Sequence, residues 1–141
     1  MRTADSNAQV APTHGDEERP DVKKILIVDD DRDMTSTLRA ALEREGFLTM
    51  TADDGNQGLA IAEAKSPDLI ILDIMMPRRS GFLVLERLRE RMEHPVPVLM
   101  VTGNSGERHR AYAEMLGVSG YFYKPVKFPM LLSKINELLD N

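Results

Sequence analysis

The chain has 141 residues, a length typical of one domain. Hydrophobic residues make up 42% of the chain, which is enough for a core and excludes a wholly disordered chain. The lack of cysteine excludes disulfides and thiolate chemistry. Of the net charge of −5, residues 1–21 carry −3 and the rest is nearly neutral. Such a body offers no electrostatic footprint for nucleic acid or anionic lipid, so we expect no direct nucleic-acid partner and no membrane partner.

The first 21 residues are polar and contain proline and glycine, without the periodicity of a strand or a helix. We predict a disordered acidic tail over residues 1–21 and one folded domain over residues 22–141. No secretory signal is recognisable, and the longest apolar runs, such as residues 69–72, are far too short to span a membrane. A cytoplasmic location is therefore expected.

Beyond the tail, short apolar runs alternate with amphipathic segments. The runs predict strands at residues 24–28, 47–52, 68–74, 97–101 and 119–123. Helical spacing of apolar residues predicts helices over residues 34–42, 58–64, 82–92, 107–116 and 131–139. Gly46 and Gly117 are placed to end two helices, and either Asp54 or Asn56 can cap the second helix. This alternation indicates the α/β class, with a parallel sheet covered by helices on both faces.

Polar side chains follow several of the predicted strands. Because the carboxyl ends of parallel strands share one edge of the sheet, where such folds bind ligands, we expect these side chains to converge. They are Asp29, Asp30 and Asp31 after the first strand, Asp73 after the third, Thr102 after the fourth and Lys124 after the fifth.

Converging carboxylates repel one another and raise each other's pKa unless a cation lies between them. Mg²⁺ suits one to three carboxylates together with water and a phosphate. The charges of Asp29, Asp30 and Asp73 would balance those of Mg²⁺ and Lys124, so the neutral cluster could stabilise a transferred phosphoryl group. Asp73 is the candidate nucleophile because it ends the most apolar strand.

Each of these residues also has a simpler explanation. The acidic run 29–31 can cap the next helix, and we expect Asp31 and Asp33 to be solvated acids of its first turn rather than metal ligands. Thr102 suits any strand, and Lys124 could belong to a surface turn. An idle buried carboxylate at Asp73 would be costly, however, which favours a functional role.

Four segments resemble the receiver domain of two-component response regulators. The resemblance covers about residues 23–140 and rests on ILIVDDD at 25–31, LDIMMP at 72–77, VTG at 101–103 and YFYKP at 121–125. It implies a flavodoxin-like, doubly wound (βα)5 fold with the strand order 2-1-3-4-5 of the chemotaxis receiver.

The resemblance also implies roles. Asp73 would accept a phosphoryl group from a sensor histidine kinase or a histidine phosphotransfer protein, so the chain would be a phosphoacceptor rather than a turnover enzyme. Asp29, Asp30 and Asp73 would hold Mg²⁺ together with the backbone carbonyl of Met75. Lys124 would contact a phosphoryl oxygen.

The resemblance also implies a conformational switch, because this chain has residues at the positions that change conformation in receiver domains on phosphorylation. Thr102 would hydrogen-bond another phosphoryl oxygen, and Tyr121 matches an aromatic residue that turns inward as Thr102 moves, although ordinary packing could also explain Tyr121. The signal would leave through the face made by the fourth helix, the fifth strand and the fifth helix. A cis bond is implied between Lys124 and Pro125.

Three positions depart from the family pattern. Ser80 replaces a common aspartate, Met75 places an apolar side chain two residues after Asp73, and Gly103 replaces a common alanine, which would leave more room for Tyr121. We hypothesise that Met75 and Asn104 set the lifetime of the phosphorylated state. Two groups of arginines are expected to be solvated: Arg78 with Arg79, and Arg87 with Arg89 and Arg91. The pair Arg78 and Arg79 flanks the site, where it could meet a donor protein.

Two other functions are compatible with parts of this pattern. A phosphatase of the haloacid dehalogenase type needs a second aspartate where Met75 stands, which argues against that reading. An interaction domain independent of phosphorylation would normally lack one of the acids or the lysine. Because the sequence ends soon after the last predicted helix, we expect a single-domain regulator that acts on an unknown downstream protein, either as a monomer or as a phosphorylation-dependent homodimer.

Overall fold

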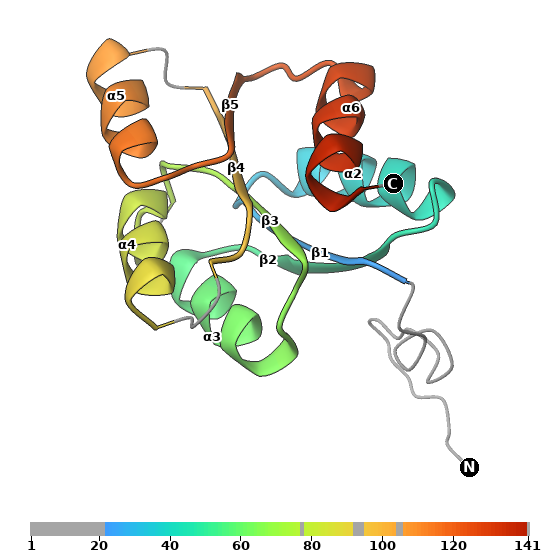
Figure 1. The fold of residues 1–141 in the computed structure, drawn as a ribbon, viewed down its shortest axis with the longest axis horizontal. Coiled ribbons are helices and arrows are strands. Elements are labelled where there is room, and N and C mark those ends of the chain that lie inside the picture. The colour runs from blue at the N-terminus through green and yellow to red at the C-terminus, as the bar shows by residue number, and fades with distance from the viewer. Residues whose placement is uncertain (1–21, 77, 92–94, 104–105, 141) are drawn as a thin grey trace.

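The computed structural model describes residues 22–76, 78–91, 95–103 and 106–140. The predicted tail and Asn104 lie outside these ranges, as does Pro77. Strands and helices alternate along the described chain (Figure 1). The elements are β1 (Lys24–Val28), α2 (Arg32–Arg44), β2 (Leu48–Ala52), α3 (Gly55–Lys65), β3 (Leu69–Leu72), α4 (Gly81–Arg91), β4 (Val98–Thr102), α5 (Glu107–Met115), β5 (Gly120–Tyr123) and α6 (Phe128–Leu139).

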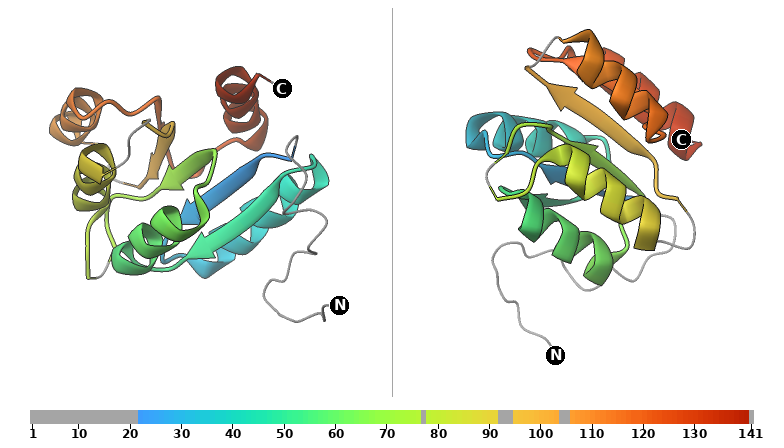
Figure 2. Two further views of the ribbon diagram at one scale, coloured as in Figure 1. Left: turned by 60° about the horizontal axis from the view of Figure 1, so that its bottom comes forward. Right: turned by 90° about the vertical axis from the view of Figure 1, so that its left-hand side faces the viewer.

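The five strands form one parallel sheet in the order β2-β1-β3-β4-β5, which confirms the implied doubly wound topology (Figure 2). β3 is the central strand, and all four of its residues are buried. A strand buried on both faces must be apolar throughout, which explains the uninterrupted sequence LIIL.

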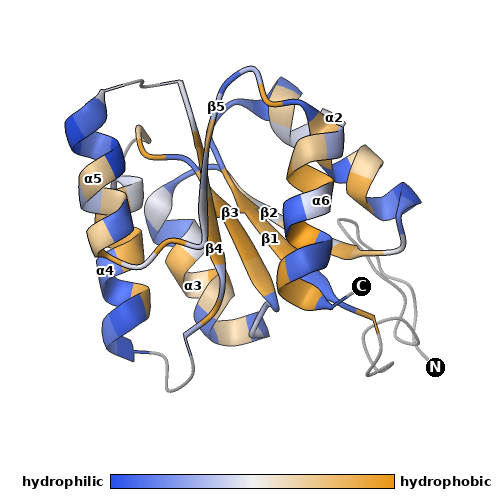
Figure 3. Cartoon of the chain, turned by 45° about the horizontal axis from the view of Figure 1, so that its top comes forward, coloured by the Kyte–Doolittle hydropathy of each residue, from blue (hydrophilic) through white to orange (hydrophobic). Residues whose placement is uncertain are grey.

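Helices cover both faces of the sheet (Figures 1 and 3). One apolar cluster joins α3, α4 and α5 to the sheet and includes Leu59, Leu85 and Ala113. The other joins α2 and α6 to the opposite face through residues such as Leu42 and Ile135. Successive strand residues point to opposite faces, so β1, β3, β4 and β5 contribute to both clusters and fix the helices on either side.

Helix boundaries follow the local sequence. Gly46 and Gly117 have φ angles of +98° and +87°, the left-handed conformation that ends a helix and that glycine adopts without strain. α3 begins at Gly55, three residues before the predicted start. The reason is that Asp54 acts as the cap, and its carboxylate accepts the Gln57 amide at 2.8 Å.

Arg89 ties α4 to the end of α5. Its guanidinium donates to the backbone carbonyls of Val96 at 3.0 Å, Leu116 at 3.3 Å and Gly117 at 2.9 Å. Arg89 was predicted to lie on a solvated face, and this was wrong, because the carbonyls left open at the end of α5 need donors that the helix itself does not supply.

The helices of the described chain are short. Within residues 22–76, 78–91, 95–103 and 106–140, none has both the length and the apolar character that a membrane span requires.

Candidate functional site

The sheet brings together the backbones of the residues that follow its strands. The Asp29 amide donates to Ala52 O at 3.0 Å, the Asp73 amide to Val28 O at 3.0 Å, and the Lys124 amide to Thr102 O at 2.8 Å. These hydrogen bonds continue the parallel ladders one residue past each strand. The positions of Asp29, Asp73 and Lys124 are therefore fixed by the sheet itself.

The side chains of these three residues converge. Lys124 Nζ lies 2.9 Å from Asp29 Oδ2 and 3.6 Å from Asp73 Oδ2. Asp29 is 3% exposed and Asp73 5% exposed, so one ammonium group serves two buried carboxylates. The remaining oxygens accept backbone amides, that of Asp31 for Asp29 at 2.9 Å and that of Ile74 for Asp73 at 2.8 Å.

One lysine does not neutralise two buried carboxylates. Burial, followed by the charge of Asp29, raises the pKa of the Asp73 carboxyl to about 6, although Lys124 and a hydrogen bond with Thr102 act in the opposite direction. Burial alone would lower the pKa of Lys124, but the hydrogen bond and charge of Asp29 raise it overall. The site therefore has an excess of negative charge and favours a further cation.

The donor set fits a hard divalent cation. Asp29, Asp30 and Asp73 each offer a carboxylate oxygen, and these oxygens all lie within 4.8 Å of one another. Asp30 is exposed, so the cluster is open to solvent on one side. Oxygen ligands with access to water are what Mg²⁺ requires. Met75 is 60% exposed, and its thioether is too soft a donor for a hard cation, so at this position only the backbone carbonyl could serve such a metal.

Thr102 and Tyr121 are buried beside this edge. Thr102 ends β4 and is fully buried. The Tyr121 ring packs against Tyr123 with centroids 5.4 Å apart, and the Arg110 guanidinium lies 5.6 Å from the Tyr121 ring. The Tyr121 hydroxyl is buried without a hydrogen-bond partner among the described residues, and burial raises its pKa.

Three further local features lie around the site. The Lys124–Pro125 bond is cis, as the resemblance implied. Asp31 caps α2 by accepting the Met34 amide at 3.1 Å. A Cβ atom added at Gly103 would meet nothing within 4 Å, so open space surrounds this position. The effect of Gly103 on an inward turn of Tyr121 stays a prediction.

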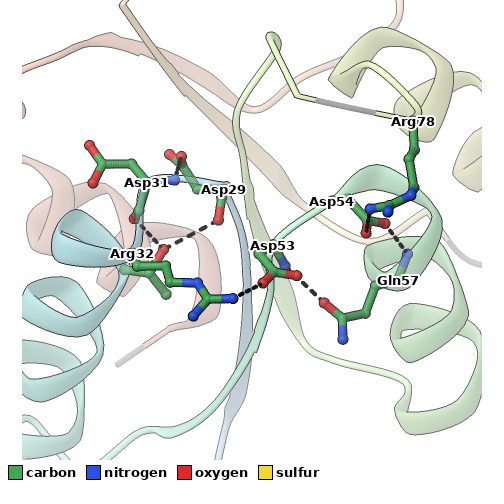
Figure 4. A network of polar contacts seen from close by, with 8 residues as sticks. Asp29, Asp31, Arg32, Asp53, Asp54, Gln57 and Arg78 are labelled. Atoms are coloured by element: carbon green, nitrogen blue, oxygen red, sulfur yellow. Dashed lines mark hydrogen bonds and ion pairs between the residues drawn. The ribbon is translucent and has the colours of Figure 1, made fainter.

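Two arginines beside the site are engaged within the chain. Arg78 forms an ion pair with Asp54 at 3.0 Å, and Arg79 donates to Asn56 Oδ1 at 2.7 Å (Figure 4 shows the first pair). Both had been predicted to be solvated. Asp54 and Asn56 carried a sequence signal only as alternative candidate caps, and that signal does not reveal their arginine partners 24 and 23 residues later.

An apolar groove of about 500 Å³ opens beside Lys124, between α2 and the start of α6. Its walls include Met34, Leu38, Val126 and Phe128. Asp31 and Asp33 line it as well, so apolar surface and negative charge lie next to the convergent acids.

Taken together, the doubly wound parallel sheet and the acids and lysine at its carboxyl edge define a class of α/β domains that handle a phosphoryl group and a metal ion. The model of the response regulator receiver domain matches residues 25–136, and the chain belongs to this family. It is thus a receiver domain of the two-component type, and its acidic cluster fits the phosphorylation and Mg²⁺ site of that family.

Known relatives differ in length. The chain is 41% identical over 118 residues to the transcriptional regulatory protein CpxR of Escherichia coli, a match that covers 84% of this chain and 50% of CpxR. It is 35% identical over 117 residues to the protein PilH of Pseudomonas aeruginosa, covering 82% of this chain and 97% of PilH. The chain thus spans about half the length of CpxR and nearly the full length of PilH.

Solved structures show the same fold. A CheY-like receiver domain protein from Methanospirillum hungatei is 35% identical with a TM-score of 0.79, and the match covers 84% of this chain and 94% of that one. The chemotaxis regulator CheY4 of Vibrio cholerae is 28% identical with a TM-score of 0.76, covering 83% and 98% respectively.

Proposed function

We propose that this chain is a phosphoacceptor of a two-component phosphorelay and that Asp73 receives the phosphoryl group. The observation that carries the proposal is the position of Lys124 Nζ, 2.9 Å from Asp29 and 3.6 Å from Asp73. The donor is a phosphohistidine on a sensor histidine kinase or a histidine phosphotransfer protein. The apolar groove beside Lys124 offers such a donor a surface next to Asp73.

In the proposed transfer, an Asp73 carboxylate oxygen attacks phosphorus, the histidine nitrogen–phosphorus bond breaks, and an acyl phosphate forms. Lys124 pairs with one phosphoryl oxygen and the Thr102 hydroxyl with another. Asp29, Asp30, Asp73 and the Met75 carbonyl would hold Mg²⁺, which neutralises charge on the phosphoryl oxygens when bound. The chain then acts as a stoichiometric acceptor and not as a turnover enzyme.

The signal is proposed to pass from Thr102 to Tyr121 and on to the face made by α5, β5 and α6. The buried Tyr121 ring, already packed against Tyr123, supports this path. An unknown downstream protein would read that face, with or without homodimer formation. The match covers 97% of PilH, so a receiver domain can make up nearly the whole of a related protein. We propose a single-domain regulator of this kind for residues 22–141, with the acidic tail before them and a cytoplasmic location.

The test is incubation with Mg²⁺ and acetyl phosphate, followed by intact mass measurement. We expect a gain of one phosphoryl group that Asp73→Asn abolishes. Asp31→Asn is the matched control, because Asn can cap α2 as Asp does and Asp31 has no proposed role in transfer. Rapid multiple turnover would support a phosphatase instead, and no labelling would support an interaction domain independent of phosphorylation.

The lifetime of the acyl phosphate is the second measurable property. Met75 has an exposed side chain two residues past Asp73, where it can limit the approach of water. Replacing Met75 and Asn104 together is expected to change the dephosphorylation rate. An unchanged rate would refute their proposed role.

A further inference from the structure

The connection that follows β3 is fastened to the start of α3 by two arginines. Arg78 Nη1 lies 3.0 Å from Asp54 Oδ2, and Arg79 Nε lies 2.7 Å from Asn56 Oδ1. Asp54 uses its other oxygen to cap α3 through the Gln57 amide, so the same carboxylate holds two elements (Figure 4). We call Arg78, Arg79, Asp54 and Asn56 the clasp.

The backbone itself shows how closely the two segments meet. A Cβ atom added at Gly55 would overlap the carbonyl of Arg79, so only glycine permits this approach. Arg78 has a φ angle of +70°, which non-glycine residues rarely adopt and which persists where the surroundings hold it. The ion pair with Asp54 is such a restraint.

The two ends of the connection meet beside the phosphoacceptor. The Gly81 amide donates to Ile74 O at 2.7 Å, and a Cβ atom at Gly81 would overlap the Asp73 carbonyl. The Ile74 amide in turn donates to Asp73 Oδ1 at 2.8 Å. The shape of the connection therefore bears directly on the orientation of the Asp73 carboxylate.

We propose that Arg78 and Arg79 are positioning residues, which hold the connection after β3 against α3 and thereby set the geometry of Asp73 and of the Met75 carbonyl. This inference rests on the proposed function, because that function makes the Met75 carbonyl a ligand of Mg²⁺. Neither arginine contacts the reacting atoms. Their effect on the site passes through the backbone.

If the arginines acted only through their charge, removing one would change the affinity for Mg²⁺ in the opposite direction from a loss of positioning. Removing a positive charge near an acidic cluster strengthens cation binding, since less repulsion opposes the incoming ion. Loosening the backbone that supplies a ligand weakens binding. Arg78→Asn removes the charge and the ion pair while keeping a residue that tolerates a positive φ. Asn56→Ala breaks the contact with Arg79 without any change of charge.

The matched control is Arg32→Gln. Arg32 forms an exposed ion pair with Asp53 at 3.1 Å, near the same acids but away from the connection (Figure 4). The experiment measures amide hydrogen exchange at Ile74 and Gly81 in the metal-free full chain, and then the dissociation constant for Mg²⁺ by calorimetry.

Both clasp variants are expected to exchange at these two amides at least about threefold faster than the parent chain and to bind Mg²⁺ about three- to tenfold more weakly. Arg32→Gln should leave exchange unchanged and bind Mg²⁺ equally well or more tightly. Unchanged exchange in the clasp variants would overturn the proposal, and so would faster exchange with unchanged or tighter Mg²⁺ binding. If the parent chain binds no Mg²⁺, the proposed function fails, and the exchange rates alone then decide whether the clasp holds the connection.

Discussion

Replacing Asp73 by asparagine should stabilise the metal-free protein at neutral pH. The pKa of Asp73 is raised from 3.8 to about 6 by burial and by Asp29, so its ionisation in the folded state is unfavourable. A difference of about two pH units corresponds to about 3 kcal/mol of stability lost once the group is ionised. Asparagine keeps an oxygen for the Ile74 amide and carries no charge, so the gain can approach this value.

The stability gained by Asp73→Asn should increase with pH. Because the folded pKa lies above the unfolded one, the native state binds the additional proton between about pH 4 and pH 6. The contribution of Asp73 to stability is therefore fully present below this window and is lost as the pH rises through about 6. The two proteins should be nearly equally stable at pH 4 and differ by about 3 kcal/mol at pH 8.

Urea unfolding followed by circular dichroism, in buffer with a chelator, gives both free energies of unfolding. The control is Asp33→Asn, an exposed acid of α2, which should shift stability by less than about 0.5 kcal/mol at either pH. A gain of equal size at pH 4 and pH 8, or a loss at pH 8, would refute the reasoning. Adding Mg²⁺ should then stabilise the parent protein more than Asp73→Asn.

The other predictions concern the surroundings of this carboxylate. Lys124→Ala should raise the pKa of Asp73 above its value in the parent protein, because the nearby ammonium group lowers that pKa. NMR titration of the Asp73 carboxyl carbon measures the change, and an unchanged pKa would contradict the prediction. Gly81→Ala should cost about 2 kcal/mol or more in unfolding free energy, because its methyl group would overlap the Asp73 carbonyl. Gly103→Ala is the control and should cost under about 1 kcal/mol, since open space surrounds it, so equal losses in urea unfolding would count against the steric explanation. Removal of residues 1–21 is expected to leave the melting temperature and labelling by acetyl phosphate unchanged, and a large fall in melting temperature would show otherwise.

The fold could be predicted because its three inner strands, β1, β3 and β4, are buried on both faces. Residues 69–72 and 98–101 are apolar without interruption, which only a strand covered by helices on both sides explains well. The convergence of Asp29, Asp73 and Lys124 follows from the same logic, since parallel strands end at one edge. The start of α3 was less predictable. Gly55 is a poor helix former, and the helix begins there because the Asp54 side chain caps it.

The contacts of the arginines could not be predicted from the sequence. Arg78 and Arg89 look like solvated cations in the linear sequence, and for Arg89 the helical spacing points to Glu86 rather than to the carbonyls that it binds. Arg78 binds Asp54, which lies 24 residues away in the sequence. Arg89 binds Leu116 and Gly117, which lie 27 and 28 residues away. Such contacts depend on how α3, α4 and α5 pack on the sheet. Local patterns carry no information about this packing.

The three carbonyls bound by Arg89 have a mechanical consequence for α5. The C-terminal end of α5 is pinned by hydrogen bonds, because Leu116 and Gly117 accept from Arg89 of α4. The first turn of α5 contacts α4 through aromatic rings instead, with the His109 and Phe82 centroids 5.6 Å apart. Hydrogen bonds to the backbone are directional and fix a position more firmly than a contact between rings. We expect any displacement of α5 to be a swing about this pinned end. The largest excursion would then occur at the end closest in sequence to Thr102, and cutting the pin with Arg89→Ala should turn the swing into a translation of the whole helix, visible as chemical-shift changes along its full length.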